Sequence, residues 1–430
     1  MSDSPGGCAV IIAFDLCFCS DHKDGRLTKY SARKGDNDPQ LQLGRAMRFA
    51  FFTSIVPDGD PTTGFEIAND AVLAGLRELG HSVTVFGFRL PRQAGAGLGD
   101  QVVLGTRELE NATAGGGQKL VWLARALQHG LPFAAAKLVD FPKHELARAV
   151  SEHGPFDAHI LNSYQMAAAF PELLQHPYLY VAHNVEHRSA QQNAEVSPSI
   201  LQRYLYRRDA RLLRSLEEDL CKQARFTWTF SADDTSDHDL SENTGCHLPL
   251  FLPMSDAQEI YAKKQYDVGL IGTWSWQPNF LGLKWFVEEV VPKLPVDISI
   301  AVAGSVPDTP LKPDPRVQYL GRVDSAENFL NSVRIIPLIS RGGTGVQLKT
   351  IEAFQSGRAC VATSSSLRGI DVLPENCLQA DTSNAFCNAL VTLIELEKAG
   401  DLAVADGADF LKKQRDGMAD GLRLGLAALA

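Results

Sequence analysis

One stretch in the last third of the chain combines residue types that could bind a phosphate. An apolar run at 335–339 is followed by a glycine-rich turn with Gly343, Thr344 and Gly345, and then by a helix-like pattern. A glycine loop between a strand and a helix presents unpaired backbone N–H groups to an anion, and the helix dipole adds to the attraction. The segment therefore predicts an anion-binding loop.

Two charged residues follow this loop at helical spacing. Lys349 falls in the first helical turn, where its stem leans back toward the loop. Glu352 follows three residues later on the same face. A cation for phosphate beside a carboxylate that could accept two sugar hydroxyls predicts a nucleotide-sugar site. The alternative is an ordinary exposed pair, which is worth only about 0.2–0.5 kcal/mol.

Four further residues are candidates, each with a plain structural alternative. Arg341 could clamp phosphates in bidentate fashion or cap the solvent edge of the loop. Gly272 could let the backbone approach phosphates or merely end a strand. His183 lies just beyond an apolar strand, where it could bond the transferred sugar or the leaving phosphate, or be a satisfied structural histidine. Gly64 could bring the first loop close to the substrates or serve as a turn glycine.

Composition bounds the remaining possibilities. A chain of 430 residues with 45% apolar content is long enough for two ordinary domains. A net charge of −10 leaves no broad basic face, which argues against nucleic acid and gives no support for membrane-surface association. The 8 cysteines are scattered without zinc or redox spacing, so reduced thiols and a cytoplasmic location are expected.

The hydrophobic pattern predicts an α/β protein with two doubly wound, Rossmann-like domains that face each other across a cleft. Residues 1–46 differ from the rest of the chain, and their part from Asp21 to Gly44 is polar and aperiodic, so we expect a disordered extension there. Residues 47–250 are expected to form an acceptor domain and 251–430 a donor domain, whose last helix packs back on the first. Strands are expected at 47–54, 81–87, 157–161, 178–182, 226–231, 266–272, 297–304, 317–320, 333–338 and 359–362, and helices between 64 and 80, at 204–223 and at 280–291.

Several of these segments together resemble glycosyltransferase family 4, the glycosyl transferases group 1. The stretches Gly272–Asn279 and Trp285–Leu294 resemble the opening of its C-terminal domain. The loop through Glu352, with Gly357 and the segment 361–363, looks like its donor-binding signature. Residues 47–54, 80–85 and His183–Glu186 are similar to its N-terminal domain. The likeness covers most of residues 47–400.

This resemblance implies a GT-B fold and a retaining glycosyltransferase that uses a nucleotide-activated sugar and requires neither metal nor other cofactor. Together with the residue chemistry above, it leaves His183, Lys349 and Arg341 as the candidate catalytic residues. Donor binding would fall to Gly64, Gly272, Gly343, Thr344, Gly345, Lys349 and Glu352. The acceptor could be a glycan, a lipid or a small molecule.

One departure from the family pattern concerns a carboxylate. Many members carry a glutamate eight residues before the position of Glu352, where this chain has Thr344. The subgroup with a glycine-rich loop before the lysine also lacks it. The usual role of that first carboxylate is therefore not carried over to this chain.

Two other functions stay open at this point. A GT-B epimerase or hydrolase would share the donor site, and a non-catalytic nucleotide-sugar-binding protein would fit Thr344. The first loop, 57–64, lacks G-x-G-x-x-G, which argues against a nicotinamide dehydrogenase. Neither a glycosidase-like carboxylate pair nor a G-x-S-x-G elbow is present.

Overall fold

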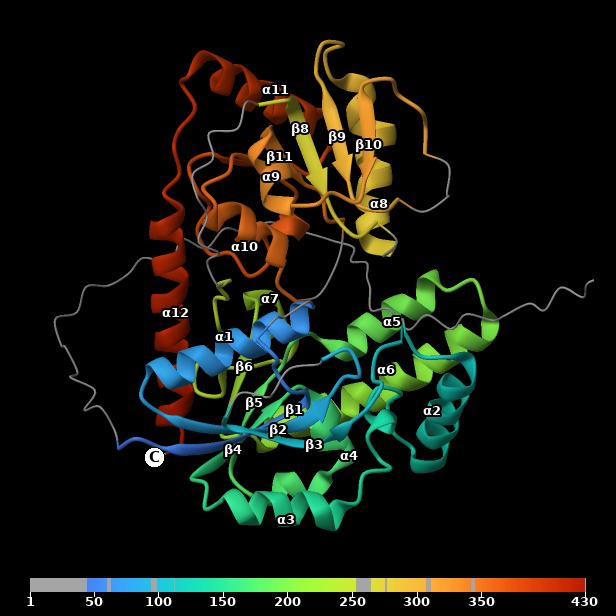
Figure 1. Cartoon of the computed structure of the whole chain (residues 1–430), viewed down its shortest axis with the longest axis vertical. Helices are drawn as coiled ribbons and strands as arrows, with labels where there is room; N and C mark the ends of the chain where they lie inside the picture. The colour runs from blue at the N-terminus through green and yellow to red at the C-terminus, as the bar shows by residue number, and fades with distance from the viewer. Residues whose placement is uncertain are drawn as a thin grey trace, which may run out of the picture.

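Two parallel β-sheets, each covered by helices, make up the protein (Figure 1). The computed structural model describes residues 45–59, 63–93, 99–111, 113–252, 264–274, 277–306, 311–341 and 345–429. Residues 1–44 of the expected extension and most of the expected linker near 248–265 lie outside these ranges. Every strand pairing in both sheets is parallel.

The first sheet has the strand order β3-β2-β1-β4-β5-β6-β7. Its interior strand β1 carries a run of aromatic and small apolar residues that are fully buried, as a strand covered on both faces requires. The strands are β1 (Arg48–Ile55), β2 (Ser82–Arg89), β3 (Gln101–Thr106), β4 (Ala158–Asn162), β5 (Tyr178–Val181), β6 (Phe226–Thr229) and β7 (Gly245–His247). The associated helices are α1 (Gly64–Glu78), α2 (Gly116–His129), α3 (Lys143–His153), α4 (Tyr164–Ala169), α5 (Glu186–Val196), α6 (Ile200–Gln223) and α7 (Ala232–Asp237).

The second sheet has the strand order β10-β9-β8-β11-β12-β13. Its strands are β8 (Tyr266–Ile271), β9 (Ile300–Ala303), β10 (Val317–Gly321), β11 (Val333–Leu338), β12 (Cys360–Ala362) and β13 (Cys377–Gln379). Its helices are α8 (Gln277–Trp285), α9 (Ala326–Asn331), α10 (Leu348–Gln355) and α11 (Ser383–Ala399), and α12 (Gly407–Ala427) ends the chain. Among the described helices, none is both long and apolar enough to cross a bilayer.

The sequence pattern located the central strands of both sheets and the edge strand β10, but it missed the other three edge strands. β3 was not expected, because its residues are only half buried and lack a clear alternation. The short strands β7 and β13 were missed as well. The helix expected at 280–291 is α8, which continues into a π-helical turn at Phe286–Val290.

The last helix connects the two halves of the molecule. Figure 1 shows α12 running along the side of the protein from α10 toward α1 and β6. Near its start, Phe410 meets Phe354 of α10 with ring centroids 5.5 Å apart. Near its end, the indole of Trp228, which is fully buried, donates to the Gly421 carbonyl at 2.9 Å. Close packing at both ends holds the two sheets in one arrangement.

Gly425 tests this packing. A Cβ at this position would lie 2.4 Å from the Trp228 ring, so we expect Gly425→Ala to destabilise the protein by about 1–3 kcal/mol through overpacking. The better helix propensity of alanine would return about 0.5–1 kcal/mol. Gly117→Ala in α2 is the matched control, because nothing lies within 4 Å of its Cβ position. Thermal unfolding should show a lower midpoint for the first variant alone, and equal midpoints would contradict the packing argument.

Candidate functional site

A pocket lies where the second sheet reverses its strand order. From β8 the chain proceeds to β9 and β10 on one side, whereas β11 begins the other side, so the switch point falls between β8 and β11. In open α/β sheets, ligands bind at the carboxyl ends of the strands at such a point. A small cavity of about 60 Å³ opens there, lined among others by Ile271, Leu338, Lys349 and Glu352. Two of the residues expected to hold the donor thus meet in one pocket.

Lys349 brings a cation into this pocket. Its side chain is accessible from the pocket, yet the surrounding protein lowers the pKa of its ammonium to about 8 by desolvation. Its Nζ lies 5.5 Å from the centre of the Trp274 ring. Within the described ranges, no hydrogen bond or ion pair engages this nitrogen. Glu352 lies on the same helix, and burial raises the pKa of its carboxyl while the charge of Lys349 lowers it.

The backbone of two glycines forms the wall beside this ammonium. A Cβ on Gly272 would lie 2.8 Å from the Lys349 Nζ, and a Cβ on Gly304 would lie 1.9 Å from the Gly272 carbonyl oxygen. Trp274 is fixed next to them, because its indole donates to the Ala303 carbonyl at 2.7 Å. The absence of a side chain at Gly272 therefore lets the Lys349 ammonium lie against the backbone there. Any larger residue at this position would displace the ammonium.

Only part of the glycine loop is described. Gly343 and Thr344 lie outside the described residues, so their expected roles stay predictions. Gly345 has a φ of +73° and its N–H donates to the Asp234 carboxylate at 3.1 Å. A Cβ at Gly345 would lie 2.3 Å from the Asn184 side-chain oxygen. The loop thus touches the first-sheet half of the molecule. The Asp234 side chain from that half accepts a hydrogen bond from the N–H of Gly345 in the loop.

Arg341 and Gly64 occupy different surroundings. The Arg341 guanidinium lies 4.5 Å from the Trp285 ring centre and donates to the Asp381 carbonyl at 2.9 Å. In this arrangement it contacts that ring and carbonyl, and it is absent from the pocket lining around Lys349. Gly64 begins α1, and a Cβ there would lie 3.2 Å from Leu348, the first residue of α10. The first loop therefore does reach the helix that carries Lys349.

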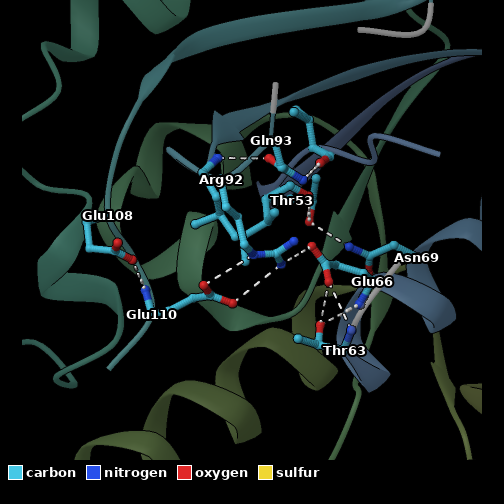
Figure 2. Close-up of polar contacts among 11 residues, drawn as sticks. Thr53, Thr63, Glu66, Asn69, Arg92, Gln93, Glu108 and Glu110 are labelled. Carbon is cyan, nitrogen blue, oxygen red and sulfur yellow. Dashed lines mark hydrogen bonds and ion pairs between the residues drawn. The ribbon is translucent and has the colours of Figure 1, made fainter. Parts of the chain in front are cut away.

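A buried carboxylate holds that first loop in place. Glu66 is 2% exposed and accepts hydrogen bonds from the backbone and hydroxyl of Thr63, both at 3.0 Å. Arg92 bonds the same carboxylate at 2.7 Å and reaches Glu110 as well. Figure 2 shows this chain of contacts at the carboxyl edge of the first sheet. The capping box fixes the start of α1, and so the place of Gly64.

His183 follows β5 and is 8% exposed. Its ring lies between Phe65 and Phe230, with centroids 4.6 Å and 5.0 Å away. Its Nε2 is 2.9 Å from the Asn162 side-chain oxygen. Desolvation lowers the pKa of His183 to about 3, so its imidazole is neutral near pH 7. A permanently neutral ring can hydrogen-bond a substrate, but it cannot supply positive charge to a phosphate.

The sequence analysis did not single out several buried polar residues near the site. Asp234, Asn162 and Glu217 are at most 2% exposed. The Glu217 carboxylate accepts the Glu186 N–H at 2.7 Å at the start of α5. Burial first, and the charge of Glu217 second, raise the pKa of the Glu186 carboxyl to about 7. A polar residue that ends an apolar strand, as Asn162 does, was the one available signal in the sequence. In the described part of the chain, no group of three metal-ligating side chains is arranged to hold an ion.

Known proteins share parts of this sequence and its fold. Residues 265–396 match the family model described as Glycosyl transferases group 1. No curated protein matches the sequence. Sucrose-phosphate synthase from Thermosynechococcus elongatus superposes with a TM-score of 0.58 at 15% identity, over 89% of this chain and 97% of that chain.

Two further solved structures share the architecture. HepE from Anabaena in complex with UDP gives a TM-score of 0.55 at 13% identity, over 89% of this chain and 100% of that one. TarM gives a TM-score of 0.56 at 10% identity, over 90% and 100%. The expected GT-B fold is therefore confirmed, as is the family resemblance of the second-sheet domain.

Asp234 yields a prediction on stability. Burial raises the pKa of this carboxyl from 3.8 to about 6. Because the folded protein holds this proton more tightly than the unfolded chain, protonation of Asp234 stabilises the fold. This stabilisation is complete below about pH 4 and is lost as the pH rises through 6. We therefore expect Asp234→Asn to gain up to about 3 kcal/mol relative to the parent between pH 4 and pH 8.

Melting temperatures at both pH values measure this gain. Asp233→Asn is the control, because its side chain is exposed on the same helix. An Asp234→Asn advantage that is equal at both pH values would show that the carboxylate costs nothing in the folded protein.

Proposed function

We propose that this protein is a glycosyltransferase that transfers a sugar with retention from a nucleoside-diphosphate sugar to a carbohydrate hydroxyl. The match of residues 265–396 to the Glycosyl transferases group 1 model and the GT-B fold support this proposal. The donor diphosphate would bind in the pocket between β8 and β11. The acceptor would be held by the first-sheet domain.

The observation that carries this proposal is the ammonium of Lys349. It lies in a pocket at a sheet switch point, against the Gly272 backbone, and no ion pair neutralises it within the described residues. Desolvating this cation costs free energy that the nearby charge of Glu352 does not fully offset, as the lowered pKa of Lys349 reflects. A bound anion would remove that cost. Diphosphate is the anion that suits a glycine loop at the start of a helix.

The nature of the donor base is proposed from a structural neighbour. HepE from Anabaena has been crystallised with UDP and with UDP-glucose. We therefore propose a UDP-sugar as the first donor to test. Glu352 faces the same pocket as Lys349 and would accept sugar hydroxyls of the donor.

The transfer step would need few protein groups. The bond between the anomeric carbon and the diphosphate oxygen breaks, and the acceptor oxygen bonds that carbon on the same face. The acceptor proton passes to the departing diphosphate. Lys349 and the loop amides would stabilise the negative charge that builds on the leaving group. Arg341 could assist only after leaving Asp381 and Trp285.

Other parts of the proposal follow from the same chemistry. No metal ion is required, because Lys349 would supply the positive charge.

The proposed acceptor hydroxyl could belong to a glycan, a lipid-linked sugar or a small molecule. A cytoplasmic location is proposed on the reduced cysteines, since Cys221, Cys246, Cys360, Cys377 and Cys387 are all free.

A transfer assay tests the function as a whole. UDP-, GDP- and ADP-sugars are ranked by thermal shift, and the best binder is incubated with a panel of sugar acceptors. Proton NMR of the product then gives the anomeric configuration. Release of free sugar or of an epimerised donor, with no acceptor modified by any pair, would replace transfer by hydrolysis or epimerisation.

Lys349→Ala tests the residue assignment. Removing a group that stabilises charge in the transition state typically costs about 10²–10³-fold in kcat. We expect that loss in steady-state kinetics. Lys413→Ala is the control, because its side chain is 62% exposed on α12 and is not among the residues that line the pocket. Turnover of Lys349→Ala within a factor of two of the parent would remove this lysine from the mechanism.

The pKa of Lys349 gives a pH dependence. Since this pKa is lowered to about 8, the ammonium is lost as the pH rises through 8, and UDP binding should weaken between pH 7 and pH 9.5. The terminal phosphate of UDP is already ionised in this range, its pKa being about 6. The limiting slope is about tenfold per pH unit.

Calorimetric titration of UDP measures this dependence. Lys349→Arg should bind with little change over the same range, because a guanidinium stays protonated. A parent affinity that is flat from pH 7 to pH 9.5 would mean that Lys349 does not meet the phosphates.

A further inference from the structure

A chain of buried hydrogen bonds lies at the switch point of the first sheet. In the strand order of this sheet, β2 lies on one side of β1 and β4 on the other, so the order reverses between β1 and β4. Thr53 on β1, Asn69 on α1 and Asn162 at the end of β4 are each at most 1% exposed. Asn162 in turn contacts His183. The direction of each bond in this chain decides which nitrogen of His183 carries its hydrogen.

The direction is set at the far end, by Thr53. Its hydroxyl donates to the Ile55 carbonyl at 3.2 Å, which uses its one proton. The hydroxyl oxygen can then only accept, and two amide groups approach it, from Asn69 at 3.2 Å and from Asn162 at 3.4 Å. Both side chains must therefore present their NH₂ groups to Thr53.

The remaining amide atoms follow from this constraint. With its NH₂ on Thr53, Asn69 turns its oxygen toward Asn162, which donates to it at 2.5 Å. Asn162 therefore turns its own oxygen toward the Nε2 of His183. An amide oxygen only accepts, so Nε2 must carry the hydrogen. Reversing both amides would set two oxygens against the Thr53 hydroxyl, which has one proton, and would leave the Ile55 carbonyl without it.

We propose that Thr53, Asn69 and Asn162 are positioning residues that hold His183 as the Nε2–H tautomer, so that it meets substrate through the lone pair of Nδ1. This rests on the proposed function, in which His183 borders the transfer site. A phosphate oxygen offers only lone pairs at neutral pH and is repelled by Nδ1. A sugar hydroxyl can donate to it. His183 therefore recognises a hydroxyl of the transferred sugar or of the acceptor, and not the diphosphate.

Two further observations support a fixed, neutral ring. Phe65 packs against the ring of His183 at a tilt of 34°, and Phe230 meets it edge-on at 81°. These contacts leave the ring little freedom to rotate away from Asn162. Burial keeps the imidazole uncharged, since it lowers the pKa of His183. The ring is therefore a hydrogen-bond acceptor over the whole neutral pH range.

The tautomer can be measured without any substrate. Protein labelled with ¹⁵N-histidine is studied by two-bond ¹H–¹⁵N correlation spectra at pH 7, and the His183 signals are identified by their loss in His183→Gln. The expected pattern is that of a single Nε2–H tautomer. A parent spectrum with the hydrogen on Nδ1, or with an imidazolium, would overturn the proposal.

Variants at the far end of the chain test the relay itself. Thr53→Val removes the hydroxyl with little change in volume, so both amides become free to turn and a population with the hydrogen on Nδ1 should appear. Thr53→Ser is the matched control, because it keeps the hydroxyl and should keep the tautomer. An unchanged spectrum in folded Thr53→Val would mean that Thr53 does not set the direction.

Kinetics separate this proposal from the function on which it rests. Asn162→Ala should lower kcat/KM with the donor identified above by roughly tenfold, the value of one ordinary hydrogen bond. The dissociation constant of UDP, which lacks the sugar, should stay the same. An equal loss of UDP affinity would place His183 on the phosphates and refute the hydroxyl assignment. Lys349→Ala, by contrast, tests the diphosphate site alone.

Discussion

Both halves of the candidate site depend on where a parallel sheet reverses its strand order. Neighbouring strands at such a point send their connections to opposite faces, so the backbone ends there are left uncovered by their own helices. In this protein one switch point holds Lys349 and the other holds Asn162. Contacts between Gly64 and Leu348, and between Gly345 and Asp234, bring the two edges together. The packing of α12 on both domains maintains that arrangement.

The electrostatics of the two edges differ in kind. The second-sheet edge carries a cation whose pKa is lowered by desolvation, in a chain whose net charge is −10. The first-sheet edge carries a histidine that burial keeps neutral, and carboxyls of Asp234 and Glu186 whose pKa values burial raises. Local placement, and not overall charge, therefore makes the pocket suitable for an anion. In the proposed function this placement also separates the two tasks, with phosphate bound at the second-sheet edge and hydroxyls at the first-sheet edge.

The contact between Asp234 and the Gly345 amide has a consequence for ligand binding. A carboxylate on a loop amide satisfies the same donor that a phosphate oxygen would satisfy. An anionic ligand that takes this amide must displace Asp234 or bind beside its charge. Since Asp234 belongs to the first-sheet domain and Gly345 to the second, such an exchange would alter a contact between the two domains. Domain closure around substrates is a common device in enzymes that must exclude water.

Local patterns in the sequence predicted the central strands, the glycine loop and the Lys349–Glu352 pair, because each of these depends on neighbours within a few residues. The edge strand β3 escaped, since a half-exposed strand lacks a distinctive hydrophobic period. The sequence could propose Arg341 as a phosphate ligand, but only the fold shows its contact with Trp285 and Asp381.

Tertiary structure alone decided the contacts that cross long stretches of chain. Asn69 and Asn162 are 93 residues apart, and Gly345 and Asp234 are 111 apart. No local period links such residues, because their proximity arises from strand order and from the docking of two domains. The sequence by itself therefore determined the class of fold and the cation of the pocket. Which buried polar groups face each other, and which nitrogen of His183 holds a hydrogen, was decided by packing around the two switch points.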